Sequence, residues 1–516
     1  MPMIDAYTRS LSAAESAHLL RRATFGPNPA QIRNYTGFRA SIGVPNLLAN
    51  QPIPPGPLHP TEGRTWHNLP FIDTDEGSRI NSLKGWWTGL MAAQNTVSEK
   101  MVLFWQNHFV SSLSTVNDAR FMYRQLDLIR RNALGNFRTL VVEITKDAAM
   151  LLYLNGNSNV AGRPNQNYAR ELQELFTIGR GNYTEDDVLA AARVLTGWRV
   201  AGYRVTTTPD ITTSFTTNLH DAADKQFSAS YQNTLIKGRR DATAGEVELG
   251  ELVDMILRQP ETARFICRKL YRWFINSDIT PQVEREFIEP LAKIMRDGRY
   301  EIKPVLAALF QSEHFYDRNV RASIIKSPME LVLGTFRMFG QVVPDMATQT
   351  AAFYQYTNYA WQRSREQQMD ILDQPTVFGW RPYYDTGFYD IWISSTTLTL
   401  RNSFTDVMVT GNQRVGTNRL GIDSITVAQS APNAGDPEAF VDYLDEILFA
   451  TDLSKVQKDF LIDQVLITGG NPRYDWTLEW NEFLRTPTNA VRRASVKMKL
   501  DSLVLYMLRM AEYQVA

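Results

Sequence analysis

The sequence contains almost no cysteine and no block of one charge. Cys267 is the single cysteine among 516 residues, which excludes an intramolecular disulfide and any cysteine-based zinc or iron–sulfur site. The 54 basic and 55 acidic residues leave a net charge of −1 and do not cluster by sign. Nucleic acid or an anionic membrane is therefore not expected as the main partner. A bound metal would need His, Asp or Glu ligands.

Long apolar runs and the best-known catalytic motifs are also missing. No stretch of about 18 apolar residues occurs, so no membrane span is expected. Residues 1–26 lack the apolar segment and cleavage site of a signal peptide, which predicts a cytoplasmic protein unless a leader has been removed for export. The absence of GxSxG, Walker A, HExxH and GxGxxG motifs disfavours serine hydrolases, P-loop NTPases, zincins and dinucleotide-binding folds.

What the sequence does contain is a large hydrophobic fraction with helical spacing. Hydrophobic residues make up 44% of the chain, enough to bury a large core. Apolar side chains recur every three or four residues in most segments, so we predict a mainly α fold, a large multi-helix bundle in one domain spanning 1–516. The Thr-rich segment 203–232 predicts a β-hairpin within an insertion of about 203–240. A long loop is expected at about 410–437.

The stretch 155–198 has the clearest signals for where helices begin and end. A polar Asn/Gly-rich loop precedes a helix that Asn165 or Asn167 can cap. After a glycine break, Thr184 and Asp187 have the spacing of a capping box and announce a second helix. Together these signals predict a helical hairpin with fixed ends.

Two carboxylates lie on the first helix of this hairpin. Glu171 and Glu174 are three residues apart and share a helix face, beside Arg170. They could be ordinary solvated acids that interact favourably with the helix dipole. Alternatively, carboxylates held next to a polar loop can bind a metal or form an acid/base pair.

His108 is the nearest candidate partner for these carboxylates. It lies in FWQNHF and shares a helix face with Trp105. A histidine among large apolar residues is commonly a core residue that is hydrogen-bonded through one nitrogen. A ligand or general base at His108 would have to meet Glu171 or Glu174 in space.

His220 and Asp221 form a third candidate group at the end of the Thr-rich segment. They could belong to a lid or a ligand set, or to a simple Asx-type turn. The predicted catalytic residues are His108, Arg170, Glu171 and Glu174. The predicted ligands of a divalent metal are His108, Glu171, Glu174, His220 and Asp221.

Several segments together resemble a known bacterial family. In chain order these segments are AHLLRRATFG, LFWQNHF, NYARELQELFTIGRGNYTEDDVLAAARVLTGW, HDAADKQF, ARFICRKLYRWF, SPMELVLG and QPTVFGWRPYYD. The chain is similar to the family catalogued as domain of unknown function eighteen hundred, from about residue 16 onward. The resemblance implies a large single-domain protein, often encoded beside a sulfatase-like family and often exported. The positions that match its motifs include His18, Trp105, His108, Asn167, Arg170, Glu171, Glu174, Trp198, His220 and Asp221.

Two functions follow as hypotheses. The first is an enzyme with an interior His/carboxylate site, with metal-assisted hydrolysis ahead of oxygen chemistry or metal-free acid/base catalysis, acting on a small molecule or a glycan. The second is a non-catalytic binding or assembly scaffold, in which the aromatic loop Phe378–Trp392 docks a protein or a glycan. Convergence of His108 with Glu171 and Glu174 in a cleft would favour the enzyme.

Overall fold

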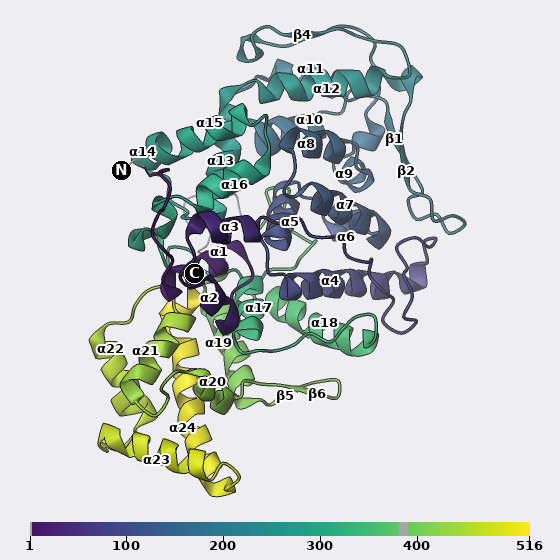
Figure 1. The fold of residues 1–516 in the computed structure, drawn as a ribbon. Coiled ribbons are helices and arrows are strands. Elements are labelled where there is room, and N and C mark those ends of the chain that lie inside the picture. The colour runs from purple at the N-terminus through teal and green to yellow at the C-terminus, as the bar shows by residue number, and fades with distance from the viewer. Residues whose placement is uncertain (1–2, 381–390) are drawn as a thin grey trace.

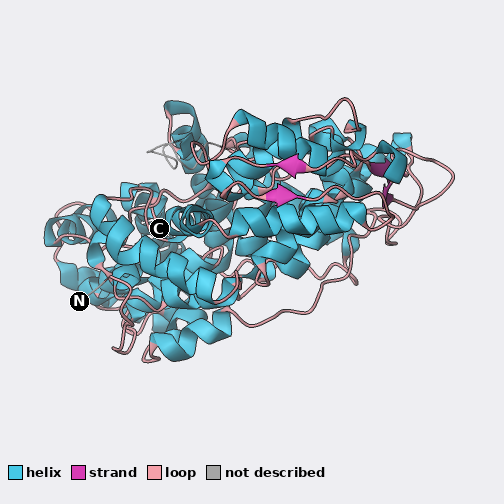
Figure 2. Cartoon of the chain, turned by 90° about the horizontal axis from the view of Figure 1, so that it is seen from above, coloured by secondary structure: helices cyan, strands magenta, loops and turns pink. Residues whose placement is uncertain are grey.

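The chain is predominantly helical, as predicted. The structure is a computed structural model that describes residues 3–380 and 391–516. In this part of the chain, the strands form only short two-stranded antiparallel hairpins, which Figure 2 shows as small arrows among many helices. The fold class, a large mainly α multi-helix bundle, is confirmed.

The first half of the chain builds the centre and one end of the molecule (Figure 1). Its helices are α1 (Ala13–Ala23), α2 (Pro29–Tyr35), α3 (Ala40–Leu47), α4 (Glu76–Ala93), α5 (Ser98–His108), α6 (Leu113–Val116), α7 (Ala119–Asn132), α8 (Phe137–Thr145), α9 (Ala148–Tyr153), α10 (Asn167–Glu171), α11 (Glu185–Val194) and α12 (Ala244–Leu257). Cap chemistry sets the first boundary: the Ser12 side chain accepts from the Glu15 backbone N–H, and the Glu15 carboxylate accepts from the Ser12 N–H.

The second half returns to the centre and then forms the opposite end, where α20 to α24 lie together in Figure 1. Its helices are α13 (Pro260–Phe274), α14 (Pro281–Val283), α15 (Glu289–Asp297), α16 (Ile302–Phe310), α17 (Pro328–Met338), α18 (Thr350–Glu366), α19 (Ser395–Thr410), α20 (Ser424–Ser430), α21 (Pro437–Leu448), α22 (Lys455–Phe460), α23 (Arg473–Arg485) and α24 (Ala490–Arg509). Prolines in the first turns of α13, α17 and α21 cost no helix hydrogen bond.

One connected cluster of buried hydrophobic side chains runs from Tyr7 to Tyr513 and joins these helices. At the centre of this cluster, the backbones of α4 and α18 pack closely along each other. A Cβ at Gly89 would lie 2.4 Å from the ring of Phe353, so glycine is needed for this spacing.

The hairpin predicted within 203–232 exists but begins earlier. Strand β1 (Trp198–Ala201) pairs antiparallel with β2 (Thr212–Phe215), and a second small hairpin joins β3 (Lys225–Gln226) to β4 (Leu235–Ile236). Helix α11 ends at Val194, and Gly197 then turns the chain into β1 at φ +98°, which only glycine takes without strain. Trp198 is the first residue of β1.

The segment predicted as a long loop at 410–437 is more ordered than expected. It contains the hairpin β5 (Gln413–Val415) to β6 (Asn418–Leu420), and helix α20 follows. Asp423 caps α20 by accepting from the Ile425 N–H at 3.2 Å. The glycines and asparagines of this segment do form turns, but the turns are short and join regular elements.

Most of the predicted aromatic docking loop, residues 381–390, lies outside the described residues. At its described ends, the side chains of Trp380 and Trp392 are buried, with ring centroids 6.3 Å apart. These two tryptophans belong to the core and do not offer a surface.

Candidate functional site

The central hairpin is built as predicted but with an unusual turn of helix. α10 continues into a π-helical segment, Leu172–Thr177, before Gly179 turns the chain at φ +82°. Gln173 projects inward from this segment, where it donates to the Ala169 carbonyl at 3.0 Å and accepts from the Tyr231 hydroxyl at 2.8 Å. The Thr184–Asp187 capping box that begins α11 is confirmed.

Glu171 and Glu174 have different surroundings. Glu174 forms an ion pair with Arg180 and accepts a 2.8 Å hydrogen bond from the Tyr183 hydroxyl. Glu171 is half-buried, and no described residue donates a hydrogen bond to its carboxyl group. Burial, together with the charge of Glu174, raises the pKa of Glu171 to about 7. Glu171 can therefore exchange a proton near neutral pH.

Arg170 turns away from both carboxylates. Its guanidinium donates two 2.7 Å hydrogen bonds to Glu185 at the start of α11. This paired geometry is typical of a strong Arg–carboxylate contact, and it raises the pKa of Arg170 further. Arg170 therefore links the two helices of the hairpin.

His108 is buried and both of its ring nitrogens are engaged. Nε2 lies 3.0 Å from the carbonyl oxygen of Phe176, which can only accept, so Nε2 carries the proton. Nδ1 then accepts from Nζ of Lys269 at 2.5 Å. Burial and the neighbouring amine lower the pKa of His108 well below its usual value, and burial lowers that of Lys269. A neutral imidazole with both nitrogens occupied has no lone pair left for a metal.

Lys269 was not identified from the sequence, although a signal was present. It follows the buried Ile266 by three residues on α13, and its side chain lies on the inward face of that amphipathic helix. A lysine at a core position of a helix is unusual and indicates a specific internal partner. That partner is His108.

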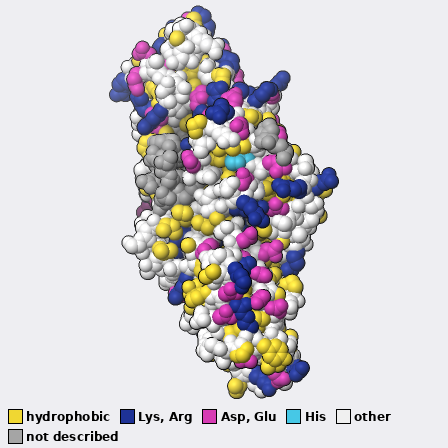
Figure 3. Space-filling view, turned by 90° about the vertical axis from the view of Figure 1, so that its left-hand side faces the viewer, with side chains coloured by type: hydrophobic (Ala, Val, Ile, Leu, Met, Phe, Trp, Pro, Cys, Tyr) yellow, Lys and Arg dark blue, Asp and Glu magenta, His cyan; other side chains and the backbone are white. Residues whose placement is uncertain are grey.

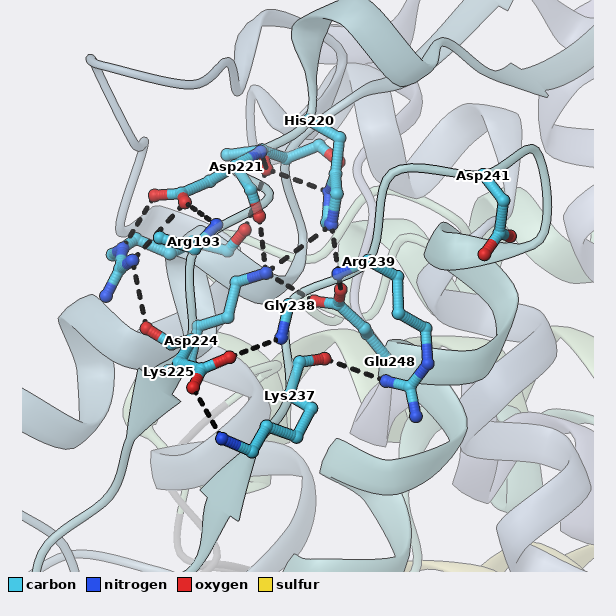
Figure 4. A network of polar contacts seen from close by, with 12 residues as sticks. Arg193, His220, Asp221, Asp224, Lys225, Lys237, Gly238, Arg239, Asp241 and Glu248 are labelled. Carbon is cyan, nitrogen blue, oxygen red and sulfur yellow. Dashed lines mark hydrogen bonds and ion pairs between the residues drawn. The ribbon is translucent and has the colours of Figure 1, made fainter.

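His220 and Asp221 belong to a separate polar network (Figure 4). Asp221 forms an ion pair with Arg193 at 2.6 Å. The His220 ring lies between the Thr196 carbonyl, at 3.0 Å, and Oε1 of Glu248, at 3.2 Å. This network closes the insertion against α11 and α12.

The centre of that network is an ion pair without solvent contact. Nζ of Lys225 lies 2.5 Å from Oε2 of Glu248, and both side chains are 0% exposed. The backbone N–H of Arg239 donates to the other oxygen of Glu248 at 2.8 Å. Glu248 was missed because it follows Glu246 in a helix whose spacing gives no sign of a buried acid.

The predicted metal ligands consequently fall into three separate contact sets. His108 pairs with Lys269, Glu174 pairs with Arg180, and Asp221 pairs with Arg193. In residues 3–380 and 391–516, no group of three or more His, Cys, Asp or Glu side chains is arranged to hold a metal ion. The five predicted ligands therefore do not form one set: His108, Glu174 and Asp221 contact basic side chains, His220 lies against Glu248, and Glu171 has no donor among the described residues.

Open space lies elsewhere on the molecule. A groove of about 800 Å³ runs between α2, the end of α4, the end of α17 and α20, and its lining includes none of the predicted site residues. A second groove, of about 590 Å³, lies between residues 50–54 and the start of α5. The free cysteine, Cys267, is buried.

The surface carries mixed charge. Figure 3 shows acidic and basic side chains interspersed on one long face, with scattered hydrophobic side chains between them. Among the described helices, none has both the length and the hydropathy needed to span a bilayer. This agrees with the absence of long apolar runs in the sequence.

Comparison with known proteins gives a family but no activity. No curated protein and no solved structure matches the chain. The family model described as "Protein of unknown function (DUF1800)" matches residues 18–515, nearly the whole chain. This protein therefore belongs to the DUF1800 family, as the order of its motifs had indicated.

Proposed function

We propose that this protein is a non-catalytic binding or assembly protein that holds an apolar segment of a protein partner. The observation that carries the proposal is the open groove beside α17. In contrast, most of the side chains predicted to react are already paired with other residues inside the protein. An enzyme of the kind predicted needs side chains with free lone pairs facing a cleft. His108, Glu174 and Asp221 have internal partners instead.

The lining of the groove favours an apolar guest. Many of its residues are small or hydrophobic, among them Pro29, Ala93, Met338, Val342, Val343 and Val427. Val342 is 83% exposed, which is unusual for a valine beside a concave surface. Helix α17 ends before Gly340, at φ +66°, and this turn presents Val342 to the groove. Burial of such a surface is a common driving force for protein association.

A buried arginine at the edge of the groove favours a guest with an acidic group. The guanidinium of Arg337 donates to the carbonyls of Gly26 and Ala92, each at 2.6 Å, and to side-chain oxygens of Gln31 and Asn95 at 3.1 Å. All these acceptors are neutral. Burial lowers the pKa of Arg337 to about 10, so the group stays charged at neutral pH and attracts a carboxylate.

Selection from a library of displayed peptides tests this proposal, because such a library does not require the partner to be identified first. Wild-type protein would be used for positive selection, and Val342→Asp for comparison. Val491→Asp is the matched control because Val491 is 80% exposed and lies on α24, away from the groove lining. Peptides with apolar and acidic residues that bind the wild type and the control, but not Val342→Asp, are expected. Peptides that bind all three proteins equally would contradict the proposal, and enrichment of glycans on an array would favour the alternative guest.

A hydrolytic enzyme is the second candidate, and Glu171 is the observation that favours it. Its half-buried carboxyl group has a pKa of about 7, which suits a general acid or base near neutral pH. The metal-assisted version has no assembled ligand set to support it among the described residues. A panel of chromogenic esters, glycosides and phosphate esters would test the wild type against Glu171→Gln. Turnover that is lost in the variant and that changes with a midpoint near pH 7 would support this candidate over the first.

A further inference from the structure

The second groove, beside the start of α5, is bordered by segments that are far apart in the sequence. Residues 50–54 form one wall, and the ends of α4 and α7 and the starts of α5 and α16 form the others. The chain after residues 50–54 is fixed in place because Nε1 of Trp86 donates to the carbonyl of Pro55 at 2.9 Å. The groove measures about 590 Å³, and sites for small molecules span roughly 300–1,000 Å³. A small organic molecule therefore fits in it.

Part of the groove is apolar. Ile53 lines it together with Leu90 and Leu134. Ile53 is 41% exposed, although isoleucine is among the residues most often buried. An aliphatic group bound against Ile53 would remove this surface from water, which is favourable. The lining therefore suits a ligand with an apolar side chain.

Two side chains of opposite charge at the start of α16 also line the groove. Nζ of Lys303 donates to Oδ1 of Asn50 at 2.6 Å, and Oε1 of Glu301 accepts from Nδ2 of Asn136 at 2.9 Å. Both of these amide partners are neutral. Among the described residues, neither Lys303 nor Glu301 has an ion-pair partner. One ligand in the groove can therefore offer a counter-charge to each of them.

A buried arginine adds a further donor to the lining. The side chains of Arg130 and Glu99 are 5% and 2% exposed, and Nε and Nη2 of Arg130 donate to Glu99 at 2.6 and 3.0 Å. The guanidinium carbon lies 4.8 Å from the centre of the Trp86 ring. The remaining amino group, Nη1, is shielded from water and has no acceptor among the described residues. A buried donor without an acceptor is unfavourable, and an oxygen atom of a ligand that reached it would satisfy it.

The presence of both charges decides which kind of ligand fits. A simple carboxylate would be attracted by Lys303 but repelled by Glu301, and a simple amine would meet the reverse situation. A zwitterion places a favourable charge beside each residue. The apolar part of the lining further requires that this zwitterion carry a hydrophobic group.

We propose that the second groove binds a free α-amino acid with an apolar side chain. Glu301 holds the ammonium group, and Lys303 holds the carboxylate together with Nη1 of Arg130. Ile53 and Leu134 contact the side chain. Hydrogen bonds between oppositely charged groups are stronger than the bonds to neutral amides that Glu301 and Lys303 make without a ligand. The site is separate from the groove beside α17 and does not depend on the proposed docking function.

Calorimetric titration and thermal unfolding of the wild type with L-leucine, L-isoleucine and L-phenylalanine test the proposal. For a Kd near 0.1 mM, 10 mM of the amino acid is expected to raise the Tm by ~2–3 °C. N-acetyl-L-leucine lacks the ammonium group, L-leucinamide lacks the carboxylate and glycine lacks the apolar side chain. Each should bind at least ~10-fold more weakly than L-leucine. Failure of all three amino acids to bind, or equal binding of N-acetyl-L-leucine and L-leucine, would overturn the proposal.

Two variants locate the binding site. Lys303→Met should weaken L-leucine binding at least ~10-fold, and Glu301→Gln should remove the preference for L-leucine over N-acetyl-L-leucine. Lys293→Met is the matched control, because the Lys293 side chain is 69% exposed on α15 and does not line the groove; its L-leucine binding should persist. Unchanged L-leucine binding by both groove variants would overturn the proposal. If a groove variant fails to fold, the comparison of ligands on the wild type decides the question alone.

Discussion

Replacement of Glu248 by glutamine should destabilise the protein measurably. In the native chain Glu248 accepts from Lys225 at 2.5 Å and from the Arg239 N–H at 2.8 Å, and lies 3.2 Å from Nε2 of His220. Lys225 and Glu248 are 0% exposed, so water cannot solvate the Lys225 ammonium once the carboxylate is removed. Glutamine has nearly the same shape, and the change therefore isolates the effect of leaving Lys225 without a counter-ion.

The expected magnitude follows from the burial of the pair. Removing one partner of a buried ion pair costs about 3–5 kcal/mol. At about 2.1 cal/mol/K per residue, a chain of 516 residues has an unfolding entropy of about 1.1 kcal/mol/K. Glu248→Gln should then lower the Tm by ~3–5 °C, provided that the chain unfolds as one unit. The larger value applies if the glutamine amide also repels the Lys225 ammonium.

The effect should also depend on pH in a defined direction. Burial by itself raises the pKa of Glu248, but hydrogen bonds from His220 and Lys225 outweigh it and hold the pKa below its ordinary value of 4.5. A carboxylate with a lowered folded-state pKa contributes stability above the unfolded-state value, and that contribution is lost as the pH falls through the folded-state value. The difference between wild type and Glu248→Gln should be complete at pH 7 and shrink below pH 4.5.

Thermal unfolding followed by circular dichroism at pH 7 and at pH 3.5 measures both effects. Glu246→Gln is the control, because Glu246 lies on the same helix but is half-exposed and reaches Lys146 at 3.1 Å; a shift below ~1 °C is expected. The double variant Lys225→Met with Glu248→Gln should recover part of the loss, because the stranded charge is gone. A Tm within 1 °C of wild type for Glu248→Gln at pH 7 would refute the reasoning.

Three further results are expected. Gly179→Ala should lower the free energy of unfolding in urea by about 1–3 kcal/mol, because φ is +82° and a Cβ would lie 2.8 Å from the Phe265 ring. Gly181→Ala is the control, since Gly181 has the same φ of +82° but lies in open space, and it should lower the free energy by less. An equal loss for both variants would exclude a role for the ring. Glu171 should titrate with a midpoint near pH 7 in carbon-13 NMR, because burial and Glu174 raise its pKa to about 7. A raised folded-state pKa means that stability falls as the pH rises from 4.5 to 7, so Glu171→Gln should melt above the wild type at pH 8 and lose this advantage at pH 4; a variant that melts lower at pH 8 would contradict this. Dialysis against EDTA should leave the Tm unchanged within ~1 °C, because no described group of ligands is assembled, and a fall of several degrees would revive the metal hypothesis.

Local chemistry made much of the fold predictable. The capping box at Thr184 begins a helix where its spacing indicated, since its contacts involve residues only three positions apart. Apolar periodicity identified the helices for the same reason. The start of the hairpin was less accurate, because it was expected within 203–232 and β1 begins at Trp198.

The candidate site was predictable only in part. Spacing correctly placed Glu171 beside Glu174 and indicated that His108 is buried. It could not show that His108 contacts Lys269, which lies 161 positions further along the chain, or that Glu248 pairs with Lys225. Two acids at helical spacing have the same pattern whether they bind a metal or an arginine. The environment that distinguishes these cases comes from other helices.

The sequence by itself determined the helical composition, the helix caps, the lack of a disulfide and the family. Each depends on residue type and on neighbours within a few positions. Only the tertiary structure decided which charged and polar side chains meet. It places His108 against Lys269 and Glu248 against Lys225, and it brings Arg130 and Lys303 to the lining of one groove. The physical reason is that charge and burial act through space, and the pairing of a charged side chain is fixed by how distant helices pack.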